Sequence, residues 1–269
     1  MKKAIMSLLS AALTLSGFSS CGKTGNNISS TTHTYVLVHG AWQAPYVWDA
    51  VSADLVKRGN KVIVVELPGH GADTTPTYKL SIDAYRDKVI DAIGTNDKVI
   101  LVGHSMGGMV VTSVAEKIPS RISKLVYIGA FIPANGQSLE MLAMNDPNSQ
   151  LGASLSQSAD KLTLDVKREN LARLFINDGS QADKDHVIDN YRPEPAIPFS
   201  NKLSITKENF GSVEKVYIKT QQDIVISPAL QDKMIATAGI KTVYAINSSH
   251  SPFLSQPNAV ASLLARISQ

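Results

Sequence analysis

The sequence has little cysteine, few aromatic residues and almost no net charge. One cysteine occurs in 269 residues, so no disulfide can form within the chain. Aromatic residues make up 6% of the chain and charged residues 18%, but 43% are hydrophobic, which is enough to build a sizeable core. A disordered chain, a collagen-like chain and a coiled coil are therefore excluded.

The charge balance gives no sign of a polyanionic partner. The chain has 26 Lys and Arg residues against 23 Asp and Glu, a formal net charge of +3. Lys2 and Lys3 belong to a segment that we expect to be removed, and without them the balance falls to 24 against 23. Because no basic stripe remains, we expect no nucleic-acid partner.

Motifs that hold metals or nucleotides are also missing from the places where they would act. The sequence has no H-E-x-x-H, C-x-x-C or clustered carboxylate pattern of a metal site. No G-x-G-x-x-G or G-x-x-x-x-G-K-[ST] follows a predicted strand, as a nucleotide-binding loop would require. We therefore expect no metal and no cofactor.

Residues 1–20 have the pattern of an export signal. Lys2 and Lys3 precede an apolar stretch from Ala4 to Leu15, and small residues follow it. The apolar run is too short, and too rich in Ser and Thr, for a membrane-spanning helix. We expect residues 1–20 to be a signal peptide that is removed from an exported protein.

Cys21 follows this signal directly and resembles the lipid-attachment site of bacterial lipoproteins, although Phe18 stands where that pattern usually has Leu. The resemblance implies lipidation of Cys21, membrane attachment through it, and a periplasmic or outer-membrane location in a bacterium. The alternative is ordinary signal-peptidase cleavage with an incidental cysteine. Residues 21–33 are rich in Gly, Ser, Thr and Asn, which predicts a flexible tether before a folded part that begins near Thr34.

Six short, β-branched runs are nearly continuous in hydrophobicity, which is typical of parallel strands buried on both faces of a sheet. They are residues 35–38, 61–65, 98–102, 124–128, 215–218 and 242–245. Stretches of helical length and period lie between and after them, at residues 47–58, 81–93, 107–118, 228–238 and 258–267. This alternation predicts an α/β fold, a mostly parallel sheet with helices on both faces, whose ligand lies beyond the carboxyl ends of the strands.

One interval interrupts the alternation. Residues from about 133 to 212 are more polar, with helical patterns near 138–144 and 162–175 and no clear buried strand. A segment of about 80 residues is too long for a simple loop in a compact domain. We expect a domain over residues 34–269 with a helical cap inserted at about 133–212.

The candidate nucleophile is Ser105, in the run Gly103-His104-Ser105-Met106-Gly107. This G-x-S-x-G pattern lies between a predicted buried strand and an apolar predicted helix. Its glycines permit a sharp turn that presents the serine hydroxyl above the sheet. The alternative is a glycine-rich turn with an ordinary serine, which would not explain why the pattern lies between a strand and a helix.

A serine nucleophile needs a base and an acid that orients the base, which in this arrangement follow the serine in the order acid, then histidine. His250 is the only histidine after the last predicted strand. Asp223 directly follows the preceding strand, whereas Asp232 falls in the next helix and Glu214 precedes the strand. An incidental loop histidine and a helix-capping aspartate are the alternatives for His250 and Asp223.

An anionic intermediate needs backbone amides that are already in place. In this arrangement they come from the residue after the nucleophile, Met106, and from the loop after the first strand, where Ala41 is the candidate. Trp42 and Trp48 could line a substrate pocket, and Phe131, at the junction of strand and cap, could form one wall. Aromatic residues near strand ends are more often part of the core.

Seven segments together resemble the α/β-hydrolase superfamily along the whole mature length. They are VLVHGAW (36–42), ELPGHG (66–71), LVGHSMGG (101–108), YIGAFIP (127–133), LFINDG (174–179), YRPEPAIPF (191–199) and SHSPFLSQP (249–257). More narrowly, the chain is similar to bacterial carboxylesterases, such as alkyl salicylate esterases, that are related to plant methylesterases and hydroxynitrile lyases. The resemblance implies a cofactor-free serine esterase with the triad Ser105, Asp223 and His250.

Departures from some relatives narrow the expected activity. The lyase relatives have a threonine and a lysine where this chain has Gly40 and Ser251, so the resemblance favours the esterases. Dehalogenase and epoxide-hydrolase relatives need a carboxylate nucleophile in place of Ser105. We expect a carboxylesterase that forms an acyl-enzyme from small, mostly apolar esters, aromatic ones included. A lactonase, thioesterase or amidase with the same triad, and a ligand-binding receptor with slow turnover, are the alternatives; the sequence does not predict an oligomeric state.

Overall fold

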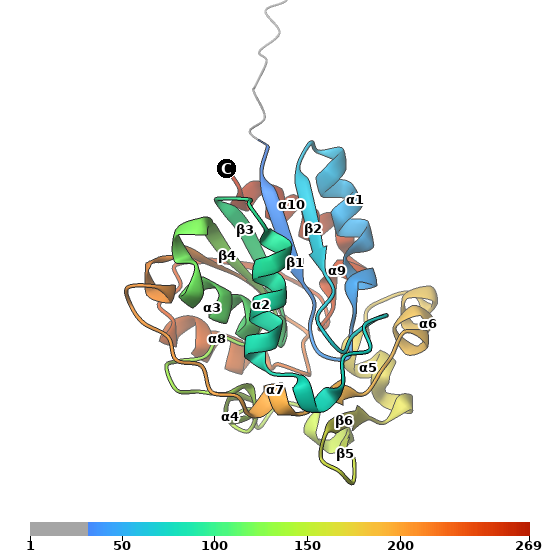
Figure 1. The fold of residues 1–269 in the computed structure, drawn as a ribbon. Coiled ribbons are helices and arrows are strands. Elements are labelled where there is room, and N and C mark those ends of the chain that lie inside the picture. Colours follow the sequence, from blue (N-terminus) through green and yellow to red (C-terminus); the bar gives the residue numbers. More distant parts are fainter. Residues whose placement is uncertain (1–31) are drawn as a thin grey trace, which may run out of the picture. The chain divides into compact units, whose positions relative to one another are not determined.

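A six-stranded sheet forms the centre of the computed structural model, which describes residues 32–269 (Figure 1). The strand order is β2-β1-β3-β4-β8-β9, and every neighbouring pair is parallel. The strands are β1 (Thr34–Val38), β2 (Lys61–Val65), β3 (Val99–His104), β4 (Ile122–Ile128), β8 (Lys215–Thr220) and β9 (Thr242–Ile246). The predicted α/β fold with a parallel sheet is confirmed.

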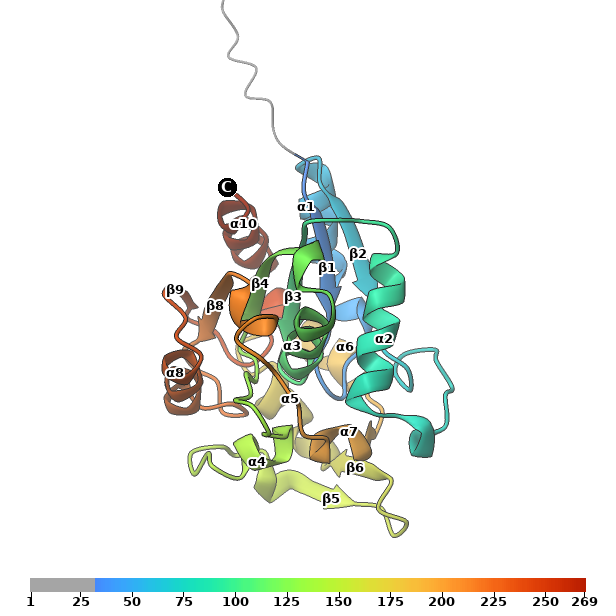
Figure 2. The ribbon, with the colours of Figure 1, turned by 60° about the vertical axis from the view of Figure 1, so that its left-hand side comes forward.

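Helices cover both faces of this sheet because successive strand residues point to opposite sides. In β1, Tyr35 and Leu37 pack with one set of helices, and Val36 and Val38 pack with the other. The first set is α1 (Asp49–Lys57), α9 (Pro252–Ser255) and α10 (Pro257–Ile267). The second set is α2 (Ile82–Ile93), α3 (Gly107–Lys117) and α8 (Pro228–Thr237). Figure 2 shows the two layers on either side of the strands.

The prediction that all six strands are buried on both faces is wrong for the two edge strands. The inner strand β3 is buried throughout, but β2 is mostly half-buried and β9 is largely exposed. Val243 in β9 is exposed to 40%. An edge strand has a neighbour on one side only, so its hydrophobicity does not by itself fix its burial.

The segment between β4 and β8 forms a cap beyond the carboxyl ends of the strands (Figures 1 and 2). Its helices are α4 (Leu139–Ala143), α5 (Leu171–Phe175), α6 (Gln181–Asp189) and α7 (Ile197–Ser200). It also contains a three-stranded antiparallel sheet of β5 (Leu155–Gln157), β6 (Thr163–Val166) and β7 (Glu194–Pro195). The helical pattern predicted near 162–175 is therefore wrong over β6, because pairing with β5 and β7 decides the backbone there.

The structure begins to describe the chain just before β1. The predicted signal peptide at residues 1–20, Cys21 and most of the predicted tether lie outside the described residues. His33, the last residue of that tether, already pairs with the domain: its N–H donates to Asn60 Oδ1 (3.1 Å) and its carbonyl accepts the Lys61 N–H (2.9 Å). Within residues 32–269 no helix is both long and apolar enough to cross a membrane.

Short 3-10 turns complete the described secondary structure. They are η1 (Pro45–Trp48), η2 (Thr77–Lys79), η3 (Pro119–Arg121), η4 (Gly152–Ser154), η5 (Arg168–Asn170) and η6 (Phe210–Ser212).

Candidate active site

Ser105 lies on a strained turn between β3 and α3. Its φ of +51° is in the left-handed region, which costs a residue with a side chain about 1–2 kcal/mol. Gly107 allows the turn to pack closely, since a Cβ there would lie 2.7 Å from the His39 carbonyl oxygen. The strain and the close approach present the Ser105 hydroxyl at the end of the sheet, as the sequence pattern predicts.

Asp223 and His250 meet at the same end of the sheet. His250 Nδ1 lies 2.8 Å from Asp223 Oδ2, and both side chains are buried. The other carboxylate oxygen, Oδ1, accepts the N–H groups of Val225 (2.8 Å) and Ile226 (2.9 Å). Because carboxylate oxygens only accept, the proton on His250 is at Nδ1, which leaves Nε2 as the basic nitrogen.

A buried hydrogen-bond network that the sequence did not predict holds the Asp223 carboxylate in place. Thr220 donates its hydroxyl to Asp223 Oδ2 (2.8 Å), and Gln231 in α8 donates to Thr220 Oγ1 (3.0 Å). Gln231 Oε1 accepts the Thr220 N–H (3.1 Å), and Gln231 Nε2 also bonds the carbonyls of Thr220 and Ile226. The network fixes the carboxylate at the end of β8. A polar glutamine on the inner face of α8 is the one signal in the sequence that points to it.

His104, within the nucleophile motif, positions the His250 backbone. Its Nε2–H donates to the His250 carbonyl (2.9 Å), and the two rings lie 4.6 Å apart between centroids. Complete burial, followed by the nearby His250 ring, holds the pKa of His104 well below its usual value, so the ring is neutral. Among residues 32–269 the hydrogen bonds of Ser105 and His250 use only backbone atoms and His250 Nδ1, so Ser105 Oγ and His250 Nε2 are unengaged.

The amides of Ala41 and Met106 are also unengaged. Neither N–H donates to another atom among residues 32–269, although both residues are buried. Gly40 sets how closely the loop that carries Ala41 approaches the turn: a Cβ at Gly40 would lie 2.7 Å from Ser105 Cβ and 2.8 Å from His104 Nδ1. The absence of a side chain at Gly40 thus lets the loop pack directly on the serine turn.

An apolar cavity of about 500 Å³ opens above Ser105, between the sheet and the cap. Trp42 and Phe131, the two predicted pocket residues, both line it, together with Ala41 and Met106. Its remaining apolar wall is Leu139, Ala143, Met144, Leu151, Leu155, Leu164, Ala196, Ile197, Phe199 and Val225. Trp48, also considered for the pocket, is instead fully buried on the other face of the sheet, 4.5 Å from the Phe253 ring.

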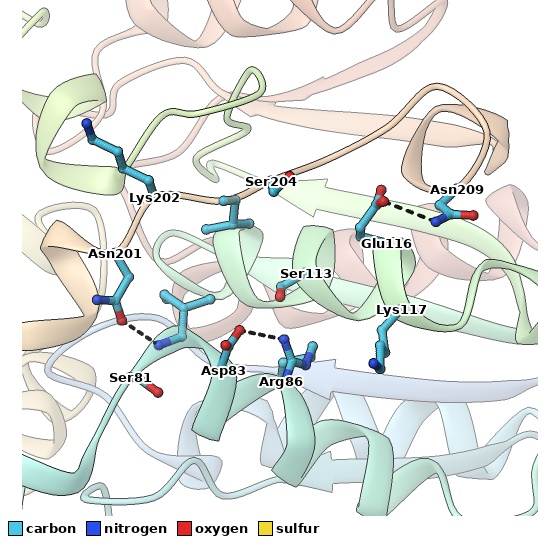
Figure 3. A pocket seen from close by; sticks show the side chains of 12 residues that line it. Ser81, Asp83, Arg86, Ser113, Glu116, Lys117, Asn201, Lys202, Ser204 and Asn209 are labelled. Atoms are coloured by element: carbon cyan, nitrogen blue, oxygen red, sulfur yellow. Dashed lines mark hydrogen bonds and ion pairs between the residues drawn. The ribbon is translucent and has the colours of Figure 1, made fainter.

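A second, larger cleft of about 650 Å³ lies between α2, α3 and residues 201–209 (Figure 3). Its charged groups are largely engaged with the protein. Glu116 accepts from Thr206, Asn209 and Phe210, and Arg86 pairs with Asp83. None of the predicted catalytic residues lines this cleft, so the cavity above Ser105 is the candidate active site.

Metal-ligating groups do not gather in the part of the chain that the structure describes. Among residues 32–269 no three His, Cys, Asp or Glu side chains are placed to hold a metal ion.

Comparison with known proteins places the chain in a family. The model of the alpha/beta hydrolase family matches residues 35–263. An Arabidopsis thaliana relative named "Putative methylesterase 13, chloroplastic" is 32% identical over 253 residues, which cover 89% of this chain and 57% of that protein. The chain thus spans little more than half the length of that relative. Methylesterase 17 of the same plant is 30% identical over 246 residues, 86% of this chain and 89% of its own length.

Solved structures agree with this result. An extracellular alpha/beta-hydrolase from a Paenibacillus species superposes with a TM-score of 0.74 at 27% identity, over 87% of this chain and 98% of that one. Residues 35–263, which the family model matches, include the cap, the turn that carries Ser105 and nearly all of the sheet. The chain therefore belongs to the alpha/beta hydrolase family and is related to the plant methylesterases.

Proposed function

We propose that this chain is a serine carboxylesterase that hydrolyses small, mostly apolar esters through an acyl-enzyme. One observation carries the proposal: the strained Ser105 turn and the unengaged amides of Ala41 and Met106 line an apolar cavity, at the end of the sheet where Asp223 and His250 pair. The names of the relatives, which are methylesterases, support the same chemistry.

Acylation uses the free nitrogen of His250. Ser105 Oγ attacks the ester carbonyl carbon while His250 Nε2 takes the hydroxyl proton, and Asp223 stabilises the imidazolium that forms. The carbonyl oxygen becomes an oxyanion that accepts from the N–H groups of Ala41 and Met106. When the C–O bond to the alcohol breaks, His250 returns the proton to the leaving oxygen, and the acyl group stays on Ser105.

Deacylation repeats these steps with water as the nucleophile. His250 Nε2 removes a proton from water, the hydroxyl adds to the acyl carbon, and the second tetrahedral intermediate collapses. Ser105 Oγ recovers the proton from His250 as the carboxylic acid leaves. Because both side chains are buried, water does not compete for the Asp223–His250 contact. The electrostatic attraction between them is therefore stronger than it would be in water.

The cavity fits a small or medium-sized apolar substrate. Its volume of about 500 Å³ lies within the range of ligand pockets. Most of its lining residues are apolar, and its polar lining residues besides Ser105 include Glu140, Gln157 and Lys161. We expect the apolar part of the ester to lie against Trp42 and Phe131.

The first test is steady-state hydrolysis of p-nitrophenyl esters from acetate to octanoate, alongside methyl salicylate. Wild-type protein should hydrolyse these esters over many turnovers, and Ser105→Ala should not. The acyl chain length that is hydrolysed fastest should indicate the size of the cavity. A single burst without turnover would indicate the receptor alternative. Preference for a lactone, thioester or amide over all these esters would move the activity to one of the other acyl-transfer classes. Activity that survives loss of Ser105 would refute the mechanism.

We also propose that residues 1–20 are an export signal and that Cys21 carries a lipid in a bacterial envelope. Lys2, Lys3, the apolar stretch and the lone cysteine support this, and all of them lie outside the described residues. Intact mass of membrane-extracted protein, compared with a Cys21→Ser variant, tests it. An unmodified mature wild type would refute lipidation.

A further inference from the structure

A second carboxylate–imidazole pair is buried between the cap and the sheet. Glu194 in β7 is fully buried, and His70, in the loop after β2, is exposed to only 4%. His70 Nε2 lies 3.0 Å from Glu194 Oε2 and 3.1 Å from Oε1, although 124 residues separate them in the chain. A buried carboxylate is costly unless it is paired and hydrogen-bonded, so this contact requires an explanation.

The geometry makes His70 an imidazolium. Its Nδ1 lies 3.0 Å from the Pro68 carbonyl oxygen, which can only accept, and its Nε2 faces the Glu194 carboxylate. With Glu194 as a carboxylate, which also accepts the Trp42 N–H, both ring nitrogens carry hydrogen. Unlike His250, His70 has no free nitrogen with which to act as a base.

The neighbouring histidine is neutral by the same reasoning. His39 Nε2 accepts the Leu67 N–H (3.3 Å), so its proton is on Nδ1, which donates to the Gly40 carbonyl (2.9 Å). Burial, and then the positive charge of His70, lower the pKa of His39 to about 3. The two rings lie 4.9 Å apart between centroids, so one charged and one neutral imidazole pack together.

The same carboxylate also holds the loop that bears the candidate oxyanion donor. The Trp42 N–H donates to Glu194 Oε2 (2.6 Å), and Trp42 Nε1 donates to the Leu164 carbonyl in β6 (3.1 Å). Trp42 has a φ of +58°, a left-handed conformation that a residue with a side chain rarely adopts unless something holds it. The cap thus fixes the residue that directly follows Ala41.

We infer that Glu194 and His70 are positioning residues that hold the Ala41 amide in place for the oxyanion. Glu194 bonds Trp42, His70 holds Glu194, and the donor geometry is complete only when the cap is seated. This inference rests on the proposed esterase function, because the Ala41 amide matters only if an oxyanion forms. Neither residue touches the substrate cavity, so both act through the loop.

The pair should also give activity an alkaline limit. Burial disfavours the charged ring, but the Glu194 charge and its hydrogen bonds outweigh burial and raise the pKa of His70. The other groups facing it are neutral His39, Arg192, whose charge opposes protonation, and Tyr85, whose pKa burial raises so that it stays uncharged. The positioning effect is therefore complete at low pH and is lost as the pH rises through the pKa of His70.

The test compares Glu194→Gln and His70→Gln with wild type in p-nitrophenyl acetate hydrolysis across pH. Losing good alignment of one oxyanion donor should lower kcat roughly 10- to 100-fold while KM changes little. Both variants should also lose the alkaline limb of the wild-type profile. Glu116→Gln is the matched control, since Glu116 bonds the returning cap segment, including Asn209, without contacting Trp42 (Figure 3). It should keep the wild-type kcat and pH profile.

The outcomes separate this inference from the proposed function. If wild type hydrolyses esters through Ser105 but folded Glu194→Gln and His70→Gln keep its kcat and pH profile, the inference is wrong. If wild type shows no Ser105-dependent turnover, the proposed function fails instead. The charge state is then still measurable by ¹⁵N NMR of the histidine rings in Ser105→Ala protein: an imidazolium His70 at neutral pH supports the pair, and a neutral ring overturns it.

Discussion

Two buried carboxylate–imidazole pairs, Asp223–His250 and Glu194–His70, differ in whether the second ring nitrogen is engaged. In the Asp223–His250 pair, only Nδ1 of the ring is engaged within the described chain. In the Glu194–His70 pair, both ring nitrogens face acceptors. The first ring therefore keeps a nitrogen that can accept a proton, whereas we infer that the second is a cation that holds a loop. Burial beside a carboxylate does not by itself make a histidine catalytic; a free second nitrogen is also needed.

Removal of the His250 ring should have the largest effect on activity. If His250 is the base of the proposed esterase, His250→Ala should lower kcat roughly 10⁴- to 10⁶-fold, as losing a triad histidine does in serine hydrolases. Burst and steady-state kinetics with p-nitrophenyl acetate measure the loss. A variant that keeps more than a hundredth of the wild-type kcat would show that His250 is not the base, and would erase the contrast with His70.

Asp223→Asn tests the acid of the first pair. Asn has nearly the same size as Asp, so the packing around Thr220 should be kept and the fold should change little. The amide would, however, change which nitrogen of His250 carries the proton, and we therefore expect kcat to fall about 10⁴-fold. Circular dichroism serves as the control for folding. Equal losses of kcat in Asp223→Asn and Glu194→Gln would mean that the two carboxylates do not have the different roles proposed for them.

His70→Ala tests the second pair through stability rather than rate. It strands the Glu194 charge in the interior, which typically costs about 3–5 kcal/mol of unfolding free energy. Because the folded-state pKa of His70 is raised, the difference from wild type should be largest below about pH 6.5 and should shrink as the pH rises through that pKa. Urea unfolding at several pH values measures it. A difference that grows with pH would contradict an imidazolium at His70.

Gly40→Thr should have the smallest effect on stability and tests how closely the loop packs on the serine turn. The added Cβ would lie within 3 Å of Ser105 and His104 atoms, and such overpacking costs about 1–3 kcal/mol. Gly152→Ala is the control for unfolding free energy, since a Cβ at Gly152 has no neighbour within 4 Å. Wild-type stability and activity in Gly40→Thr would show that the loop can move away from the turn.

The parallel sheet was predictable because its signals are local. Each strand is a short apolar run, and the turn that carries Ser105 directly follows such a strand. Ser105, Asp223 and His250 could therefore be placed by their order along the chain. The cap was predictable as an insertion but not in its content. Thr163–Val166 became a strand because it pairs with Leu155–Gln157 and β7, partners that local periodicity does not reveal.

The sequence by itself determined the α/β class, the order of the candidate catalytic residues and the apolar character of the core, since each depends on spacing along the chain. Only the tertiary structure decided which of the two histidines paired with a carboxylate keeps an unengaged ring nitrogen. Glu194 reaches Trp42 across 152 residues and His70 across 124, and Gln231 supports Thr220 from another element. Such contacts depend on where the cap rests on the sheet, which is set by packing of the whole domain and leaves no periodic trace in the sequence.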